Sequence, residues 1–162
     1  MKPVRIAIAL LFVFVASAAF AASAAQQSFE ELKALNGSWE GKETNGNVVQ
    51  VDYRVTSGGS ALMSEIKGKE DMISMFNLDG DRLLLTHYCA AGNQPRMVAS
   101  TSPDGKTITF DFLDATNLAT PDAGRMTRMV LSMPDANHHT EEWIYSDHGK
   151  EMKKSFDLWR KK

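Results

Sequence analysis

Cysteine is nearly absent from this chain. Cys89 is the single cysteine among 162 residues, so an intramolecular disulfide is excluded. The length allows one domain rather than two, and a domain of this size buries roughly two thirds of the surface that its unfolded chain exposes. The fold is therefore expected to depend on one hydrophobic core.

Clustered positive charge is also lacking. The chain has 18 basic and 20 acidic residues, and the basic residues between Lys153 and Lys162 are interleaved with apolar positions. Because phosphate binding needs a clustered positive face, nucleic acid is not expected as a partner. The sequence also has no phosphate-binding glycine loop and no dinucleotide-binding fingerprint.

Long apolar runs are confined to the first residues. The run from Ile6 to Phe20 follows Lys2 and Arg5 and precedes a stretch of alanine and serine. A basic segment, an apolar segment and a small-residue segment in this order predict a secretory signal peptide.

The small-residue segment allows cleavage after Ala21, Ala24 or Ala25, and we place the signal peptide at residues 1–25. The mature protein is then a single domain over residues 26–162 that is periplasmic or secreted. Because the apolar run is shorter than the ~20 residues that span a bilayer, no stable membrane insertion is expected after cleavage. The oligomeric state is left open.

A short helix is expected directly after the leader. Ser28 followed by Glu31 fits a capping box, and Phe29, Leu32 and Leu35 recur at helical spacing. An isolated helix of about two turns is marginal in water, so this helix is expected to dock on the rest of the domain and cap it.

The remaining chain has the pattern of strands and turns. Val49, Val51 and Tyr53 alternate with polar neighbours, as do Ile108 and Phe110, which indicates strands with one dry face. About ten such strands are expected, with no helix long enough for a crossover. An antiparallel meander of that size forms a sandwich or closes into a barrel, and closure removes the exposed edges. Turn residues recur roughly every ten positions, at Asn45-Gly46, Gly58-Gly59, Gly68, Asp79-Gly80, Gly92-Asn93, Pro103-Asp104-Gly105, Pro134-Asp135 and His148-Gly149.

Two short motifs, one near each end of the expected strand region, favour a barrel over a sandwich. Gly37-Ser38-Trp39 opens the first expected strand and Trp159-Arg160 closes the last. This combination resembles the signature of the calycins, the group that includes the lipocalins. The resemblance implies an antiparallel up-and-down barrel of about ten strands, and we expect the N-terminal helix to cap one end of it. The resemblance also implies that Arg160 lies across Trp39 and closes the barrel end, a cation–π contact of ~0.5–2 kcal/mol.

Further stretches are similar to a family of uncharacterised, lipocalin-like exported proteins of bacteria. The similarity covers most of the mature chain and implies a fold, but it carries no known activity. The matching segments are Thr56 to Leu62, Leu85 to Cys89, Gly92 to Met97, His139 to Trp143 and Gly149-Lys150.

Hairpin geometry predicts which side chains share a face of the barrel. With a two-residue turn at Ala91-Gly92, His87 lies opposite Arg96 and Cys89 lies opposite Gln94. All four side chains then share one face. An analogous turn at Asp79-Gly80 places Phe76 and Leu83 on that face as well.

The last hairpin, turning at His148-Gly149, places Trp143 opposite Lys154 and Tyr145 opposite Met152. Glu141 shares their face. If this face is the interior, Glu141 and Lys154 are expected to pair, because neither charge would be buried alone.

These faces predict a binding protein more readily than an enzyme. We expect non-covalent binding of a small, partly apolar molecule inside the barrel, and no cofactor. Eight methionines after the leader would give an adaptable apolar lining. The expected polar contacts are His87, Arg96, Gln94 and Glu141, and the expected stacking residues are Trp143 and Tyr145.

Two alternatives stay open. The first is a hydrolase or isomerase that uses His87 with Glu141, with a zinc ion as a further option, since His87 with Cys89 and His139 with Glu141 are both i, i+2 pairs. The second is a filled barrel that acts as an interaction module of the cell envelope.

Overall fold

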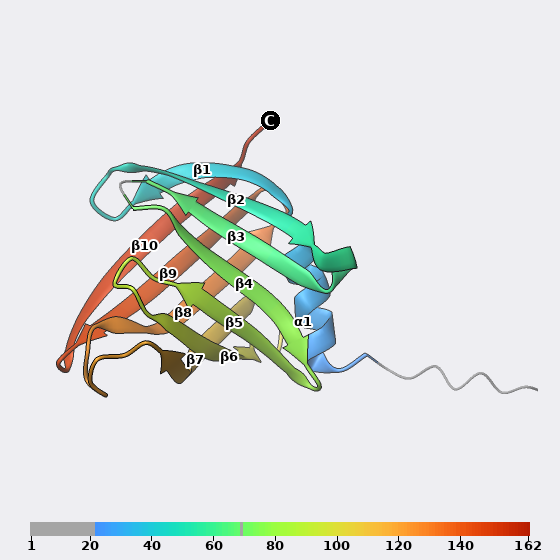
Figure 1. Cartoon of the computed structure of the whole chain (residues 1–162). Helices are drawn as coiled ribbons and strands as arrows, with labels where there is room; N and C mark the ends of the chain where they lie inside the picture. Colours follow the sequence, from blue (N-terminus) through green and yellow to red (C-terminus); the bar gives the residue numbers. More distant parts are fainter. Residues whose placement is uncertain (1–21, 69) are drawn as a thin grey trace, which may run out of the picture.

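A computed structural model describes residues 22–68 and 70–162 and shows ten strands and one preceding helix (Figure 1). Most of the expected signal peptide, residues 1–21, lies outside the described residues. The elements are α1 (Ala24–Lys33), β1 (Gly37–Glu43), β2 (Val48–Thr56), the 3-10 turn η1 (Ser57–Gly59), β3 (Ala61–Lys67), β4 (Met72–Asp79), β5 (Arg82–Tyr88), β6 (Gln94–Thr101), β7 (Thr107–Thr116), β8 (Arg125–Asp135), β9 (His138–Asp147) and β10 (Lys150–Arg160).

The strands form a closed antiparallel barrel in simple up-and-down order. Each strand pairs with its sequence neighbours, and β1 pairs with β10 to close the sheet. The alternation read from the sequence is the physical reason, because Val49, Val51 and Tyr53 of β2 are buried while their neighbours face outward. The predicted fold class is confirmed.

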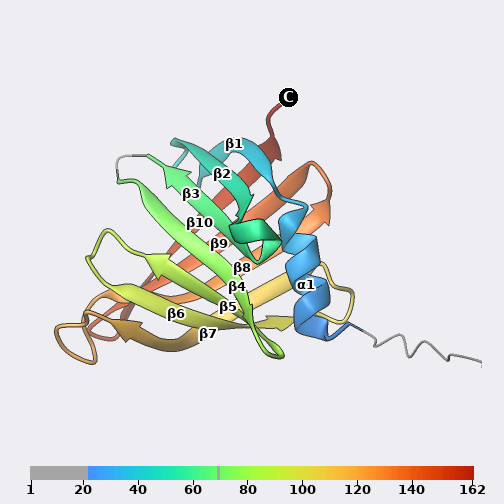
Figure 2. The same cartoon turned by 45° about the vertical axis from the view of Figure 1, so that its right-hand side comes forward.

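Helix α1 covers one end of the barrel, next to the ends of β4, β5 and β6 (Figure 2). Phe29, Leu32 and Leu35 are buried in the core, as their spacing predicts. The predicted start at Ser28 is wrong. The helix begins at Ala24 with Ser23 as its cap, and Ser28 instead faces the barrel, where its hydroxyl lies 2.7 Å from that of Thr101.

The two ends of the barrel differ. The end under α1, which we call the closed end, also receives the turns after β2, β4, β6 and β8. The opposite end, which we call the mouth, is surrounded by the turns after β1, β3, β5, β7 and β9. The described part of the chain has no helix with the length and hydropathy of a membrane span.

The β1–β10 seam is held by two features. Trp39 pairs with Arg160 in register, and the guanidinium carbon of Arg160 lies 4.3 Å from the centroid of the Trp39 ring, which is the contact that the calycin resemblance implies. Gly41 permits the close approach of the two strands, because a Cβ at that position would lie 1.7 Å from the carbonyl oxygen of Asp157.

The interior between the seam and the mouth is largely filled. Phe76 and Phe110 meet edge to face, with ring centroids 5.4 Å apart. Apolar side chains from all ten strands, from α1 and from the segment between α1 and β1 form one continuous buried cluster, made of Phe29, Leu32, Leu35, Trp39, Val49, Val51, Tyr53, Leu62, Ile66, Phe76, Leu83, Leu85, Met97, Ile108, Phe110, Met129, Leu131, Trp143, Phe156 and Leu158.

Hairpin register explains one wrong prediction. The connection between β5 and β6 has three residues between Cys89 and Asn93, with Gly92 at φ +83°, so Thr86 rather than His87 lies opposite Arg96. An odd loop length reverses the face of every following residue. Gln94 and Arg96 therefore do not share the inner face with His87.

The other two hairpins keep their predicted faces. The β4–β5 turn lies at Gly80-Asp81, so Ser74 pairs with His87, a register shift of two that leaves the face unchanged. The β9–β10 turn lies at His148-Gly149 as predicted, and Trp143 pairs with Lys154. Both turn residues have positive φ, which suits a two-residue hairpin.

Candidate functional site

A cavity of about 600 Å³ opens at the mouth of the barrel. A neighbouring hollow of about 480 Å³ shares Glu70, Met72 and Lys154 with it. The walls of the 600 Å³ cavity come from β4, β8, β9 and β10, together with the β5–β6 turn. The residues that line this larger cavity are Glu70, Met72, Cys89, Ala90, Ala91, Met126, Trp143, Tyr145, Met152, Lys153 and Lys154.

Trp143 connects this cavity to a buried polar cluster. It lines the cavity but is only 2% exposed. Its indole Nε1 donates a 2.8 Å hydrogen bond to Oε2 of Glu141, and its ring lies 4.8 Å from that of His87. A molecule in the cavity would thus contact a side chain whose orientation the cluster fixes.

Glu141 is the centre of the cluster. The Tyr53 hydroxyl donates to its Oε1 at 2.5 Å, and Nε2 of His139 lies 3.4 Å from the same oxygen. Burial alone raises the pKa of Glu141, but hydrogen bonds from His139, Tyr53 and Trp143 outweigh burial and hold that pKa below its ordinary value. The side chain is therefore a carboxylate at neutral pH, with its charge enclosed.

Tyr53 and His139 secure this carboxylate from the closed-end side. Burial and the Glu141 charge raise the pKa of Tyr53 well above its ordinary value, so Tyr53 stays a donor. The His139 ring meets Trp39 edge to face at 4.3 Å, which links the cluster to the seam residue.

His87 is a neutral buried histidine near the mouth. Its Nδ1 lies 2.9 Å from the Ser74 hydroxyl, and burial lowers its pKa to about 4. Within residues 22–68 and 70–162, its Nε2 has no hydrogen-bond partner. A buried polar atom in that state costs ~1–3 kcal/mol, and such costs are often retained where a ligand binds.

The remaining predicted site residues separate into two groups. Tyr145 lines the cavity, and burial together with Asp147 and Cys89 raises its pKa. Arg96 lies on the outer surface, where its Nε donates to Oδ1 of Asp114 at 2.6 Å, and Gln94 accepts from Thr116 there.

The prediction of an ion pair between Glu141 and Lys154 is also wrong. Lys154 reaches out to Glu43 at 2.8 Å, although its position opposite Trp143 was predicted correctly. A long lysine stem lets the ammonium stay in water, and Glu141 is bound instead by Tyr53, His139 and Trp143.

Neither of the two predicted pairs of metal ligands lies with a third ligand. Among the described residues, no group of three or more His, Cys, Asp or Glu side chains could hold a metal ion. His139 and Glu141 contact each other, and His87 contacts Ser74.

Sequence reasoning missed Tyr53 and Ser74 as members of the cluster. The alternation of side chains along the strand was the available signal, since it places Tyr53 on the same face as Val49 and Val51. A tyrosine in a buried apolar stripe usually has a hydrogen-bond partner. Its partner on β9 lies 88 residues away and could not be assigned without the barrel.

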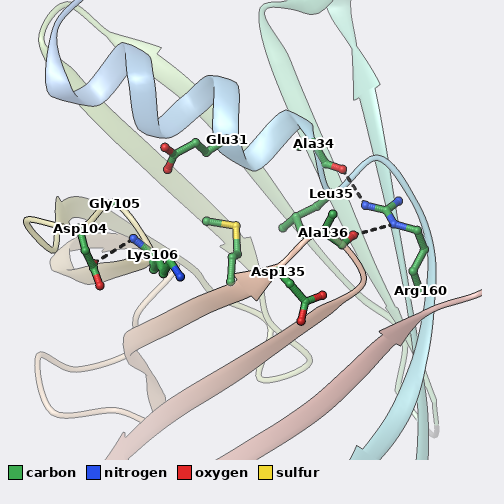
Figure 3. A pocket seen from close by; sticks show the side chains of 10 residues that line it. Glu31, Ala34, Leu35, Asp104, Gly105, Lys106, Asp135, Ala136 and Arg160 are labelled. Atoms are coloured by element: carbon green, nitrogen blue, oxygen red, sulfur yellow. Dashed lines mark hydrogen bonds between the residues drawn. The ribbon is translucent and has the colours of Figure 1, made fainter.

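A second cavity, of about 350 Å³, lies at the closed end between α1 and the β6–β7 turn (Figure 3). Two of its charged side chains, Arg160 and Asp104, are already used by the fold. Arg160 donates to the carbonyls of Ala34, Asn36 and Ala136, and Asp104 accepts from the backbone of Lys106. This arrangement closes the barrel end, so we place the candidate site at the mouth.

Comparisons with known proteins support the fold alone. No protein-family model and no curated protein matches the chain. The crystal structure of Rv2717c from M. tuberculosis is similar, with a TM-score of 0.57 and 15% identity over 83% of this chain and 98% of that one.

A protein of unknown function from the DUF3598 family (Npun_R4044) of Nostoc punctiforme PCC 73102 is also similar, with a TM-score of 0.53 and 10% identity over 81% of this chain. The match spans 49% of that longer protein. The chain thus shares its barrel fold with these solved structures.

Proposed function

We propose that the chain is an exported, lipocalin-like barrel that binds a small, partly apolar molecule non-covalently in the mouth cavity. The observation that carries this proposal is the double role of Trp143. It lines the cavity and is fixed from behind by the Glu141 carboxylate. Rigid aromatic side chains held by buried hydrogen bonds are typical of binding sites.

The cavity has the size and character that such a ligand needs. Its volume of about 600 Å³ lies within the ~300–1,000 Å³ of small-molecule sites. Tyr145 and three methionines provide apolar surface, and the rim carries Glu70 and two lysines. Because the deeper interior is filled, the ligand would lie at the mouth.

The hydrolase or isomerase alternative receives less support. A general base must come within hydrogen-bond reach of the substrate, whereas Glu141 is 1% exposed and lies behind Trp143. His87 is likewise fully buried and is separated from Glu141 by the same indole.

The test is binding of an apolar fluorescent dye by wild-type protein and by Tyr145→Ala. An aromatic contact is worth ~0.5–1.5 kcal/mol beyond its buried area, so Tyr145→Ala should weaken binding roughly three- to tenfold. Native mass spectrometry of freshly purified protein should show an added organic mass that denaturation removes.

Tyr88→Ala is the matched control, because Tyr88 is 46% exposed on the outer face. This variant should bind dye like wild type. Equal weakening by both variants, or wild-type protein that takes up no dye and carries no added mass, would contradict the proposal.

A further inference from the structure

Sulfur-bearing side chains gather around the mouth. Met72, Cys89, Met126 and Met152 all line the same cavity. Met152 is 51% exposed. Methionine is apolar, so its exposure at the rim of the cavity is not explained by contact with water. The proposed organic ligand does not explain this concentration of sulfur.

The strand register brings these side chains to one level of the barrel. Met126 of β8 and Met152 of β10 both pair with Tyr145 of β9, one on each side. Met72 and Cys89 extend the β4–β5 ladder one step beyond the Ile73–Tyr88 pair, on the inner face.

The two groups of sulfur-bearing side chains line the same cavity. Tyr145, which lies between the two methionines in the strand register, lines that cavity together with Cys89 and Met72. Methionine has three rotatable bonds and adapts to irregular spaces, so its thioether can move toward a shared centre.

We propose that the mouth binds a soft monovalent cation of the copper(I) type through Cys89, Met72 and a thioether of Met126 or Met152. Thiolate and thioether sulfur are the ligands that select copper(I) over harder divalent ions. Binding exchanges the Cys89 S–H proton for the metal, and that proton is released to solvent. No change of oxidation state is involved.

The surrounding charges are compatible with a cation. Glu70 lines the cavity together with Cys89, and its carboxylate would attract a positive ion there. The two lysines at the rim are paired with Glu142 and Glu43, which reduces their repulsion. This inference goes beyond the proposed function, because the sulfur atoms act at the rim and need no organic ligand.

The test uses silver(I) as a redox-inert probe and copper(I) in competition with a chromophoric chelator, on the purified mature protein. Wild type should bind one equivalent and release about one proton. Cys89→Ser should lower the affinity at least tenfold and abolish proton release. The double variant Met72→Leu/Met152→Leu should also lower it at least tenfold, because leucine keeps the volume and removes the sulfur.

Met63→Leu/Met75→Leu is the matched control. These two methionines pair with each other on adjacent strands and face outward, so their loss should leave the affinity unchanged. Thermal melts of each variant show whether it is folded. Three results would overturn the proposal: no competition by wild type, equal loss in the control, or dependence on Cys89 with no effect of the mouth methionines.

Failure here leaves the organic-ligand proposal intact. Dye binding depends on Tyr145 and is measured without metal, whereas silver binding depends on sulfur and is measured without dye. A protein that binds dye but no silver(I) would retain the first proposal and exclude the second.

Discussion

His87 and Glu141 are two ionisable side chains that the barrel interior holds in different charge states. Burial keeps His87 neutral, with a pKa of about 4, although the Glu141 charge opposes this effect. Glu141 is equally buried but lies beside His139 and receives donors from Tyr53 and Trp143, and these three partners favour its carboxylate form. Hydrogen-bond partners, rather than depth, decide which side chain carries charge.

The lowered pKa of His87 predicts loss of stability in mild acid. The unfolded chain takes up the proton near pH 6.5 and the folded one only near pH 4, so the unfolding free energy falls as the pH drops through that window. At ~1.4 kcal/mol per pKa unit, the loss between pH 7 and pH 4.5 is about 2 kcal/mol. Glu141 adds a loss of the same sign at lower pH.

Urea unfolding of wild type and His87→Gln at both pH values checks this. The variant should lose about 2 kcal/mol less than wild type over the interval, because glutamine does not titrate. His148→Gln is the control, since nearby Asp147 and Asp122 raise the pKa of this exposed histidine, and its removal should not protect against acid. An unchanged acid loss in His87→Gln would contradict the assignment.

At the scale of elements, the strands could be predicted from the sequence, but the side of the barrel that each side chain faces could be predicted only in part. Alternation along β2 and β7 is a local property of the sequence, and closure follows from the number of strands. The face of Arg96 depends on whether the β5–β6 loop has two or three residues, which composition does not decide. The Tyr53–Glu141 contact joins β2 and β9, and it needed the closed barrel before it could be seen.

Helix α1 also bears on where the proposed signal peptide would be cleaved. Ser23 caps the helix, and its hydroxyl accepts from the backbone N–H of Gln26 at 3.2 Å. Cleavage after Ala25 would remove this cap and the first two helical residues, whereas cleavage after Ala21 would keep both. A lost N-cap costs ~0.5–2 kcal/mol.

A protein that begins at Ala22 should therefore be more stable than one that begins at Gln26 by about 1 kcal/mol or more. Denaturant titration of the two forms measures the difference. Ser23→Ala in the longer form should reproduce the part due to the cap, and Ser23→Asp should not. Identical stability of the two forms would show that the start of α1 contributes nothing.

For the whole molecule, closure depends on the close approach of the first and last strands at Gly41. Any Cβ there meets the backbone of Asp157, and backbone cannot move aside as a flexible side chain can. Gly41→Ala should therefore lower the unfolding free energy by about 3 kcal/mol, at the upper end of overpacking effects.

Gly68→Ala is the matched control, because a Cβ at Gly68 meets nothing within 4 Å, and it should change stability by less than about 0.5 kcal/mol. Thermal and denaturant unfolding of both variants give the comparison. Equal stability of the two variants would mean that the β1–β10 seam relaxes freely.

The positions of α1 and of the end of β10 have a practical consequence. Both lie at the closed end, and Arg160 joins them through the carbonyl oxygens of Ala34 and Asn36. A tether, affinity tag or surface attachment placed directly before α1 or after β10 therefore leaves the opposite end of the barrel unobstructed. Immobilised protein would present its mouth to the surrounding solution, whichever of these two positions holds it.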